Sequence, residues 1–249
     1  MGEQSVRARH IVAMGGGGFS TEPDNPLLDD FVLGLSPRQP ARICFIPTAS
    51  GDSPHYLVKF YRAFSGRAVP TDLTLFSSPA LPRRPPATAD LQRFVLDQDI
   101  LYVGGGSTAN LLALFRVHGL DEILHLAWKR GVVLSGLSAG MICWFRASLT
   151  DSFGGHEPLH DGLGFLEGSA CPHYDEPRRR RYHELIAAGL PGGLAAEDGV
   201  ALHFLGDALA EAVGSRRDAR AFRVRPIGGR VVEEPLPVRF LGGGPTVAR

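Results

Sequence analysis

Four short apolar runs stand out in the first 140 residues, and each is closed by glycine, proline or small polar residues. They span residues 10–14, 42–47, 99–106 and 131–140. Runs of this length that are rich in Val, Ile and Leu are typical of strands buried on both faces of a sheet. We therefore predict four buried strands.

Segments with helix-like spacing of apolar residues separate these runs. Strands that alternate with helices form βαβ units, which build a parallel sheet with helices on both faces. The pattern thus predicts an α/β fold with a mostly parallel, doubly wound sheet. The expected helical segments are Leu27 to Leu35, Tyr56 to Phe64, Thr88 to Leu96, Ala109 to Phe115 and Ile123 to Trp128.

The chain changes character after Ala201. Short β-branched segments there alternate with turn signals such as Gly228-Gly229, which predicts an antiparallel β-extension of the main sheet over 205–249. A polar, proline-rich stretch at 78–86 predicts a surface connection rather than a domain boundary. We therefore expect one α/β domain over 1–249.

Composition and charge exclude several functional classes. Lys+Arg and Asp+Glu are each 26, so the zero net charge provides no basic field for nucleic-acid binding. No stretch approaches 18 apolar residues, which argues against a membrane-spanning helix, and the N-terminus has too few apolar residues for a signal peptide. Cys44, Cys143 and Cys171 are scattered and form no CxxC pair, so we expect a cytoplasmic protein without a zinc site, a metal or a cofactor.

The strongest chemical signal is Gly136-Leu137-Ser138-Ala139-Gly140, which follows an apolar run and precedes a helix-compatible segment. A strand, a tight turn and a helix start form a nucleophile elbow, in which small neighbours let the serine hydroxyl protrude. Ser138 is therefore the candidate nucleophile, and the backbone N–H of Ala139 is placed to stabilise an oxyanion. The alternative is a small-residue turn that only packs a helix on a sheet.

A serine hydroxyl needs a base, and His173 is the leading candidate among nine histidines. It lies in a strand-end loop with a preceding proline, whereas His156 and His160 lie in a glycine-rich loop and are alternatives as substrate contacts. The base in turn needs a carboxylate. Three acids remain open for that role: Glu197, Asp198 and Asp151.

These residues together resemble peptidase family S51, the family of peptidase E (an aspartyl dipeptidase) and cyanophycinase. The family is related to the class I glutamine-amidotransferase-like fold, which is flavodoxin-like. The resemblance covers roughly residues 10 to 205. Its carriers, in family order, are the glycine-rich turn at 103–112, the serine elbow at 136–140, Leu149-Thr150-Asp151, Pro172-His173-Tyr174 and Glu197-Asp198-Gly199.

The resemblance implies a serine peptidase that acts through an acyl-enzyme on short peptides, above all dipeptides with N-terminal aspartate. It implies Ser138 as nucleophile and His173 as base, with the backbone N–H groups of Gly105 and Ala139 as the oxyanion hole. The third member falls on Asp198, where peptidase E carries glutamate, so Glu197 stays an alternative. Asp151 is implied to support the site or the amino group of the substrate.

Chain order and composition bear on rival functions. The order Ser, His, acid differs from that of α/β-hydrolases, and serine in the elbow disfavours a glutaminase, which uses cysteine. An esterase or amidase on the same site remains an alternative. So does a non-catalytic nucleotide-binding protein, because the run Gly15-Gly16-Gly17-Gly18 follows a predicted strand, although no Walker lysine follows it.

Four consecutive arginines, residues 178–181, begin a predicted helix. Such runs are usually solvated faces, but Arg178 is a candidate to bind the side-chain carboxylate of an N-terminal aspartate through a bidentate pair. The expected partner is thus a short peptide substrate. The sequence leaves the oligomeric state open, and a homodimer is one of the states that we consider.

Overall fold

The structure is a computed structural model that describes residues 7–76 and 88–243. The surface connection predicted at 78–86 lies outside these residues. Within them, each predicted buried strand and each predicted helical segment is present, with boundaries that shift by a few residues. The predicted α/β class, with mostly parallel strands, is confirmed.

The larger sheet has eight strands in the order β14-β11-β10-β1-β5-β4-β2-β3. Neighbours from β1 to β3 in this order are parallel, whereas β10 is antiparallel to β1 and β11 is antiparallel to β10. The parallel part consists of β1 (His10–Met14), β2 (Arg42–Ile46), β3 (Val69–Asp72), β4 (Ile100–Val103) and β5 (Val133–Leu137). The C-terminal part adds β10 (Val200–Leu205), β11 (Ala208–Gly214) and β14 (Val238–Phe240).

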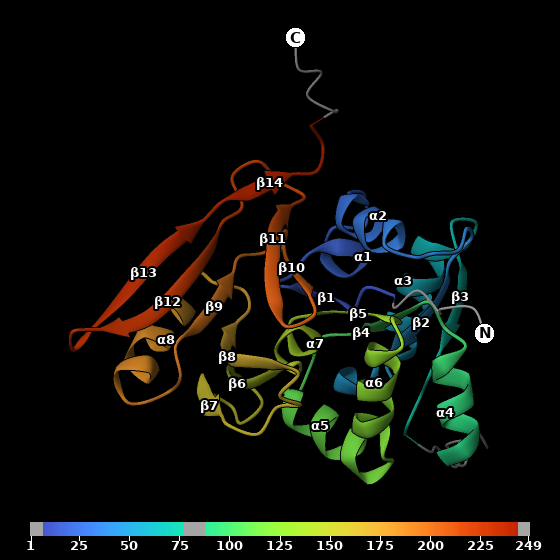
Figure 1. Cartoon of the computed structure of the whole chain (residues 1–249), viewed down its shortest axis with the longest axis horizontal. Coiled ribbons are helices and arrows are strands. Elements are labelled where there is room, and N and C mark those ends of the chain that lie inside the picture. Colours follow the sequence, from blue (N-terminus) through green and yellow to red (C-terminus); the bar gives the residue numbers. More distant parts are fainter. Residues whose placement is uncertain (1–6, 77–87, 244–249) are drawn as a thin grey trace, which may run out of the picture.

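Helices cover both faces of this sheet, because successive strand residues point to opposite sides. Val12 and Met14 of β1 pack in one apolar cluster, and Ile11 and Ala13 pack in another. The first cluster is covered by α1 (Gly18–Thr21), α2 (Leu27–Gly34) and α3 (Pro54–Phe64). The second is covered by α4 (Thr88–Leu96), α5 (Thr108–Val117), α6 (Leu120–Lys129) and α7 (Ala139–Ile142), as Figure 1 shows.

A second sheet of six strands, in the order β13-β12-β9-β8-β6-β7, lies beside the first (Figure 1). The sequence predicts β-structure at β12 and β13, but as an extension of the main sheet, and it gives little signal for β7, β8 and β9, which are short or contain glycine, as at Gly168 and Gly193. The expected C-terminal extension is therefore divided between the two sheets. The second sheet consists of β6 (Phe145–Thr150), β7 (Glu157–Leu159), β8 (Leu166–Cys171), β9 (Gly193–Ala196), β12 (Ala221–Ile227) and β13 (Arg230–Leu236).

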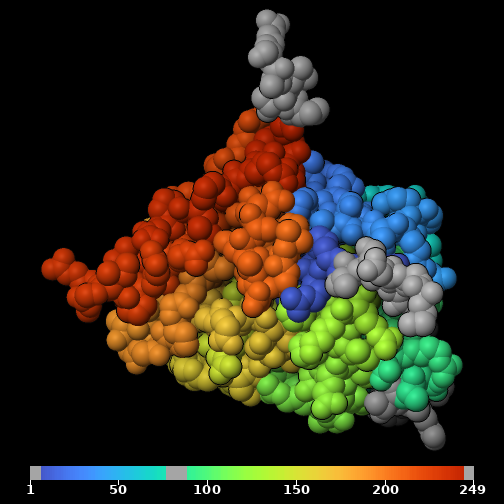
Figure 2. Space-filling view, in the orientation of Figure 1, coloured from blue at the N-terminus to red at the C-terminus, as the bar shows by residue number. Residues whose placement is uncertain are grey.

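Helix α8 (Arg178–Ala187) covers one face of the second sheet. Its Tyr182, Leu185 and Ile186 form an apolar cluster with Tyr174 and with Phe222 of β12. Hairpin β12–β13 extends along this helix and forms one side of the molecule, seen in red in Figure 2. The helix thus follows the loop after β8 in the chain and packs against the C-terminal hairpin.

The three cysteines are free and buried. Across 7–76 and 88–243, no helix combines the length and apolar character that crossing a membrane requires.

Candidate active site

Ser138 lies in the sharp turn between β5 and α7. Its backbone angles, φ 55° and ψ −113°, are rare for any residue other than glycine. Close packing enforces the turn: a Cβ at Gly136 would lie 2.4 Å from the carbonyl oxygen of Gly140, and a Cβ at Gly140 would lie 2.2 Å from that of Val103. The sequence therefore folds here as a nucleophile elbow, with the serine partly exposed at the carboxyl end of β5.

His173 and Asp198 follow two parallel neighbouring strands, β8 and β9, so they emerge at the same edge of the second sheet. His173 Nδ1 lies 2.5 Å from Asp198 Oδ1. His173 also has a positive φ of 49°, an uncommon conformation that only a well-determined surrounding structure maintains. The structure thus brings together the candidate base and one of the three candidate acids.

Asp198 is held in its charged form. The hydrogen bond from His173, together with the charges of Arg216 and Arg178, outweighs partial burial and lowers the pKa of Asp198 below its ordinary value. A carboxylate can only accept hydrogen bonds, so the neutral imidazole must carry its proton on Nδ1. Nε2 of His173 is therefore left as the proton acceptor.

The segment that follows β1 connects all three residues. The Ser138 N–H donates to the Met14 carbonyl (3.1 Å), and the His173 N–H donates to the Gly15 carbonyl (3.2 Å). The next carbonyl, that of Gly16, accepts from the residue after Asp198 (3.0 Å). Consecutive peptide groups of one strand end thus hold the candidate nucleophile, the candidate base and the candidate acid near one another.

The glycines of this segment face protein atoms at close range. A Cβ at Gly15 would lie 2.4 Å from the Ala196 carbonyl oxygen, and a Cβ at Gly16 would lie 2.0 Å from Asp198 Oδ1 and 2.9 Å from His173 Cε1. Protein atoms thus fill the side-chain positions of these two glycines. The geometry therefore favours a packing role for the glycine run over nucleotide binding.

Gly16→Ala should lower the free energy of unfolding by about 1 to 3 kcal/mol, because the added methyl group overlaps the Asp198 carboxylate and must displace it. Urea denaturation measures this change. The matched control is Gly34→Ala in α2, where a Cβ meets no atom within 4 Å and alanine should stabilise the helix by about 0.5 to 1 kcal/mol. Equal stability of Gly16→Ala and wild type would contradict the close packing.

The other two candidate acids have different partners. Glu197 forms an ion pair with Arg220, whose Nη2 lies 2.8 Å from Glu197 Oε1. Asp151 Oδ2 accepts from Arg178 Nη2 at 2.5 Å. The structure thus assigns each acid a separate position.

The four arginines of α8 also differ from one another. The Arg178 side chain is only 14% exposed and lies on Asp151, whereas Arg180 is exposed. Arg179 and Arg181 form ion pairs with Glu233 and with Glu157 and Glu184. Arg178 is therefore the arginine that turns inward.

Both candidate oxyanion donors lie beside the elbow. Ala139 begins α7, so its backbone N–H has no acceptor within the helix. A Cβ at Gly105 would lie 3.2 Å from Ser138 Cβ, and the Gly105 N–H donates to the Tyr56 hydroxyl at 3.4 Å. Burial raises the pKa of Tyr56, so this hydroxyl stays protonated and can donate a hydrogen bond.

Sequence reasoning missed two residues of this region. Tyr56 appeared only as an apolar position of a helix, and its contact with the glycine-rich turn depends on the packing of α3. Arg216 lies in a turn without a pattern, yet its guanidinium donates to the Asp198 carbonyl oxygen. His156 and His160, in contrast, flank the edge strand β7 of the second sheet.

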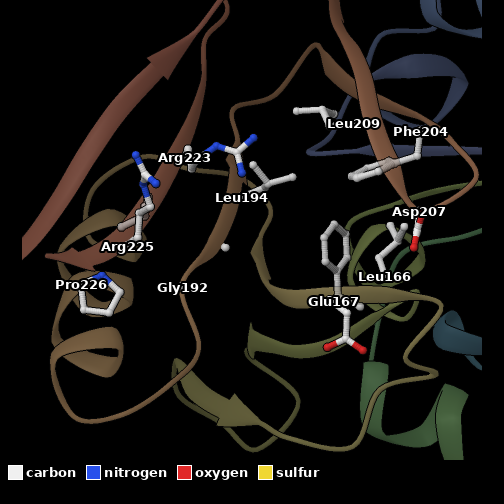
Figure 3. Close-up of a pocket in the computed structure, with 13 residues that line it drawn as sticks. Leu166, Glu167, Gly192, Leu194, Phe204, Asp207, Leu209, Arg223, Arg225 and Pro226 are labelled. Atoms are coloured by element: carbon white, nitrogen blue, oxygen red, sulfur yellow. The ribbon is translucent and has the colours of Figure 1, made fainter.

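A cavity of about 400 Å³ opens elsewhere, between the second sheet and the β10–β11 hairpin (Figure 3). Leu166 lines it at the start of β8 and Phe204 near the end of β10, whereas His173 follows the end of β8 and Asp198 precedes β10. The cavity thus lies at the opposite ends of these strands. In the described part of the chain, no cluster of three or more His, Cys, Asp or Glu side chains is arranged to hold a metal ion.

Comparison with known proteins gives consistent matches. Residues 11–212 match the family model described as peptidase family S51. The uncharacterised peptidase YgaJ of Bacillus subtilis (strain 168) is 51% identical over 238 residues, which cover 94% of this chain and 100% of that protein. Peptidase E of Streptomyces coelicolor is 28% identical over 207 residues, covering 78% and 79% of the two chains. The crystal structure of a peptidase from an acI-B1 Actinobacterium shares the fold, with a TM-score of 0.69, 18% identity and coverage of 94% and 96%.

Proposed function

Because the chain belongs to peptidase family S51, we propose that it is a serine peptidase that hydrolyses short peptides with N-terminal aspartate. The observation that carries the proposal is that an elbow serine and a hydrogen-bonded His173–Asp198 pair are held on one segment after β1. In this proposal Ser138 is the nucleophile, His173 the general base and Asp198 the acid that orients it.

The first half of the proposed reaction forms an acyl-enzyme. His173 Nε2 accepts the proton of Ser138 Oγ while Oγ bonds to the scissile carbonyl carbon, and the carbonyl π electrons move to its oxygen. The N–H groups of Ala139 and Gly105 donate hydrogen bonds to this oxyanion and stabilise it. To do so, the Gly105 N–H gives up its hydrogen bond to the Tyr56 hydroxyl. The tetrahedral intermediate collapses, the C–N bond breaks, and His173 donates its proton to the leaving amine.

The second half repeats these steps with water. His173 accepts a proton from a water molecule that attacks the ester carbonyl, and the C–Oγ bond then breaks as the proton returns to Ser138. Asp198 remains a carboxylate throughout and stabilises the imidazolium that forms in both halves, which agrees with its lowered pKa.

The Arg178–Asp151 pair supports specificity for an N-terminal aspartate. Such a residue presents a carboxylate and an ammonium group a few bonds apart, and the pair offers a guanidinium beside a carboxylate. We propose that Arg178 binds the side-chain carboxylate of the substrate and Asp151 its amino group. Substrate binding would then replace one ion pair with two.

Arg178→Gln should lower kcat/KM for an Asp-X dipeptide by about 10- to 100-fold, the scale of a lost hydrogen bond to a charged group. Hydrolysis of Ala-X should change little, because alanine has no side-chain carboxylate. The matched control is Arg180→Gln, two residues along the same helix and exposed. Equal losses for Asp-X and Ala-X would contradict the assignment of Arg178.

Two experiments test the proposed function itself. A fluorophosphonate probe should label Ser138, and a panel of Asp-X dipeptides, other dipeptides and β-Asp-Arg should identify the bond that is cleaved. Turnover of simple esters without any peptide hydrolysis would favour the alternative esterase or amidase. A nucleotide-binding protein would instead show a rise in Tm with ATP or NAD and no labelling.

The remaining parts of the proposal concern the setting of the enzyme. We propose a cytoplasmic protein, since Cys44, Cys143 and Cys171 are free thiols, as is usual in a reducing compartment. We propose no cofactor and no nucleic-acid partner, and a homodimer is the assembly to test by light scattering.

A further inference from the structure

Hairpin β12–β13 lies beyond residue 212, where the match to the family model ends. Strand β12 pairs with β9, the strand that leads to Asp198, and the hairpin packs on α8, which follows the loop of His173. The hairpin therefore contacts the elements on both sides of the His173–Asp198 pair.

Glu233 of β13 points into the space between the hairpin, α8 and the loop of His173. Its side chain is only 11% exposed. Its carboxylate accepts from the Tyr174 hydroxyl at 2.6 Å, from Arg179 Nε at 3.0 Å and from His183 Nε2 at 3.1 Å. Burial alone would raise the pKa of Glu233, but these hydrogen bonds and the Arg179 charge hold it below its ordinary value. Glu233 is thus a half-buried, charged acceptor shared by three side chains.

Tyr174 connects Glu233 to the candidate base, because it donates to Glu233 and directly follows His173 in the chain. It is 1% exposed, and its ring packs against Phe222 of β12. Its backbone N–H donates to the Ala196 carbonyl at 3.1 Å, while the His173 N–H donates to Gly15. The backbone N–H and the side-chain hydroxyl of Tyr174 are both hydrogen-bonded, so the chain at His173 is held in its conformation with positive φ.

The acid is held from the same side by the segment that enters β12. Arg220 is bonded to Glu197, the neighbour of Asp198, through its backbone N–H (2.9 Å) and through Nε (3.0 Å). Arg216 donates to the carbonyl oxygen of Asp198 itself. Tyr174, the neighbour of His173, and Glu197, the neighbour of Asp198, are thus both hydrogen-bonded to residues of the C-terminal segment 216–233.

We propose that hairpin β12–β13 positions the catalytic imidazole through Glu233 and Tyr174, so that Glu233 is a positioning residue of the reaction. This inference rests on the proposed function. Glu233 touches neither the elbow nor the Arg178–Asp151 pair among its contacts in the described structure, and it acts on the reaction by fixing the direction of His173. Its loss therefore affects the transfer of protons rather than the binding of substrate.

Glu233→Gln and Tyr174→Phe test this role. Each should lower kcat for an Asp-X dipeptide and the rate constant of fluorophosphonate labelling at Ser138 by about 10- to 100-fold, the scale of a misplaced catalytic group. KM should stay near the wild-type value. Because both changes break the same connection, the double variant should lose little more than the more impaired single variant.

The matched control is Glu234→Gln, the next residue of β13, whose carboxylate pairs with exposed Arg225 at 2.8 Å. It should behave as wild type. The stoichiometry of labelling separates positioning from unfolding: a slow reaction that still labels every molecule indicates a misdirected imidazole, whereas incomplete labelling at full speed indicates a partly unfolded protein and overturns the inference. Wild-type rates in both Glu233→Gln and Tyr174→Phe also overturn it and leave the proposed function intact. A wild-type protein whose Ser138 does not react at all overturns both.

Discussion

Ser138→Ala should lower kcat for an Asp-X dipeptide by about 10⁶-fold, the scale found when the nucleophile of another serine peptidase is removed. The change deletes the only atom that bonds to the substrate in the proposed acyl-enzyme, so neither His173 nor the oxyanion donors can compensate. Steady-state kinetics and the loss of fluorophosphonate labelling measure the effect.

The fold should survive this change. Alanine meets the same strain as serine at φ 55°, and the backbone hydrogen bond from residue 138 to Met14 is retained. The matched control is Ser135→Ala in β5, a buried serine whose hydroxyl has no hydrogen-bond partner in the described structure, so its activity and stability should be nearly unchanged. Substantial hydrolysis by Ser138→Ala with an unchanged Tm would refute the serine mechanism.

Asp198→Asn should cause the second largest loss, about 10⁴-fold in kcat, as for the corresponding change in a different serine peptidase. The amide can donate to His173 Nδ1, which favours the tautomer with its proton on Nε2, and that tautomer cannot accept the proton of Ser138. The measurement is kcat with one Asp-X dipeptide at a fixed pH.

The other two acids provide the comparison. Glu197→Gln should cost far less, because Glu197 contacts Arg220 rather than the imidazole. Asp151→Asn should give an intermediate loss through the amino group of the substrate. A larger loss for Glu197→Gln than for Asp198→Asn would transfer the orienting role to Glu197, and negligible losses for both would favour Asp151 or a two-residue Ser–His mechanism.

The fold was predictable where the sequence pattern is local. Buried parallel strands such as β1 and β4 are apolar runs, and the helices between such strands keep one apolar face, so both leave a signal in the chain. The second sheet leaves little signal, because β7 has three residues and β9 four, and β9 begins with a glycine. Strands β8 and β9 are also defined by pairing with residues far away in the sequence, which no local pattern shows.

The candidate site shows the same limit. The turn at Ser138 could be recognised because its requirement for small neighbours is met within five residues. Glu197 and Asp198 could not be separated, because adjacent residues in a loop carry equivalent signals and their directions depend on Arg220 and His173, which lie 23 and 25 residues away in sequence. The inward turn of Arg178 likewise depends on its partner Asp151, which follows β6 and lies far away in the sequence.

The proposed nucleophile and its base are carried by different sheets. Ser138 follows β5 of the larger sheet, whereas His173 and Asp198 both follow strands of the smaller one. The segment after β1 of the larger sheet bridges this division, because the Met14 carbonyl accepts from the Ser138 N–H and the next carbonyl accepts from the His173 N–H. At the seam between the sheets, Phe145 of β6 meets Phe204 of β10 with ring centroids 5.8 Å apart. We expect a change in the packing of this seam to misalign Ser138 and His173 and to slow acylation.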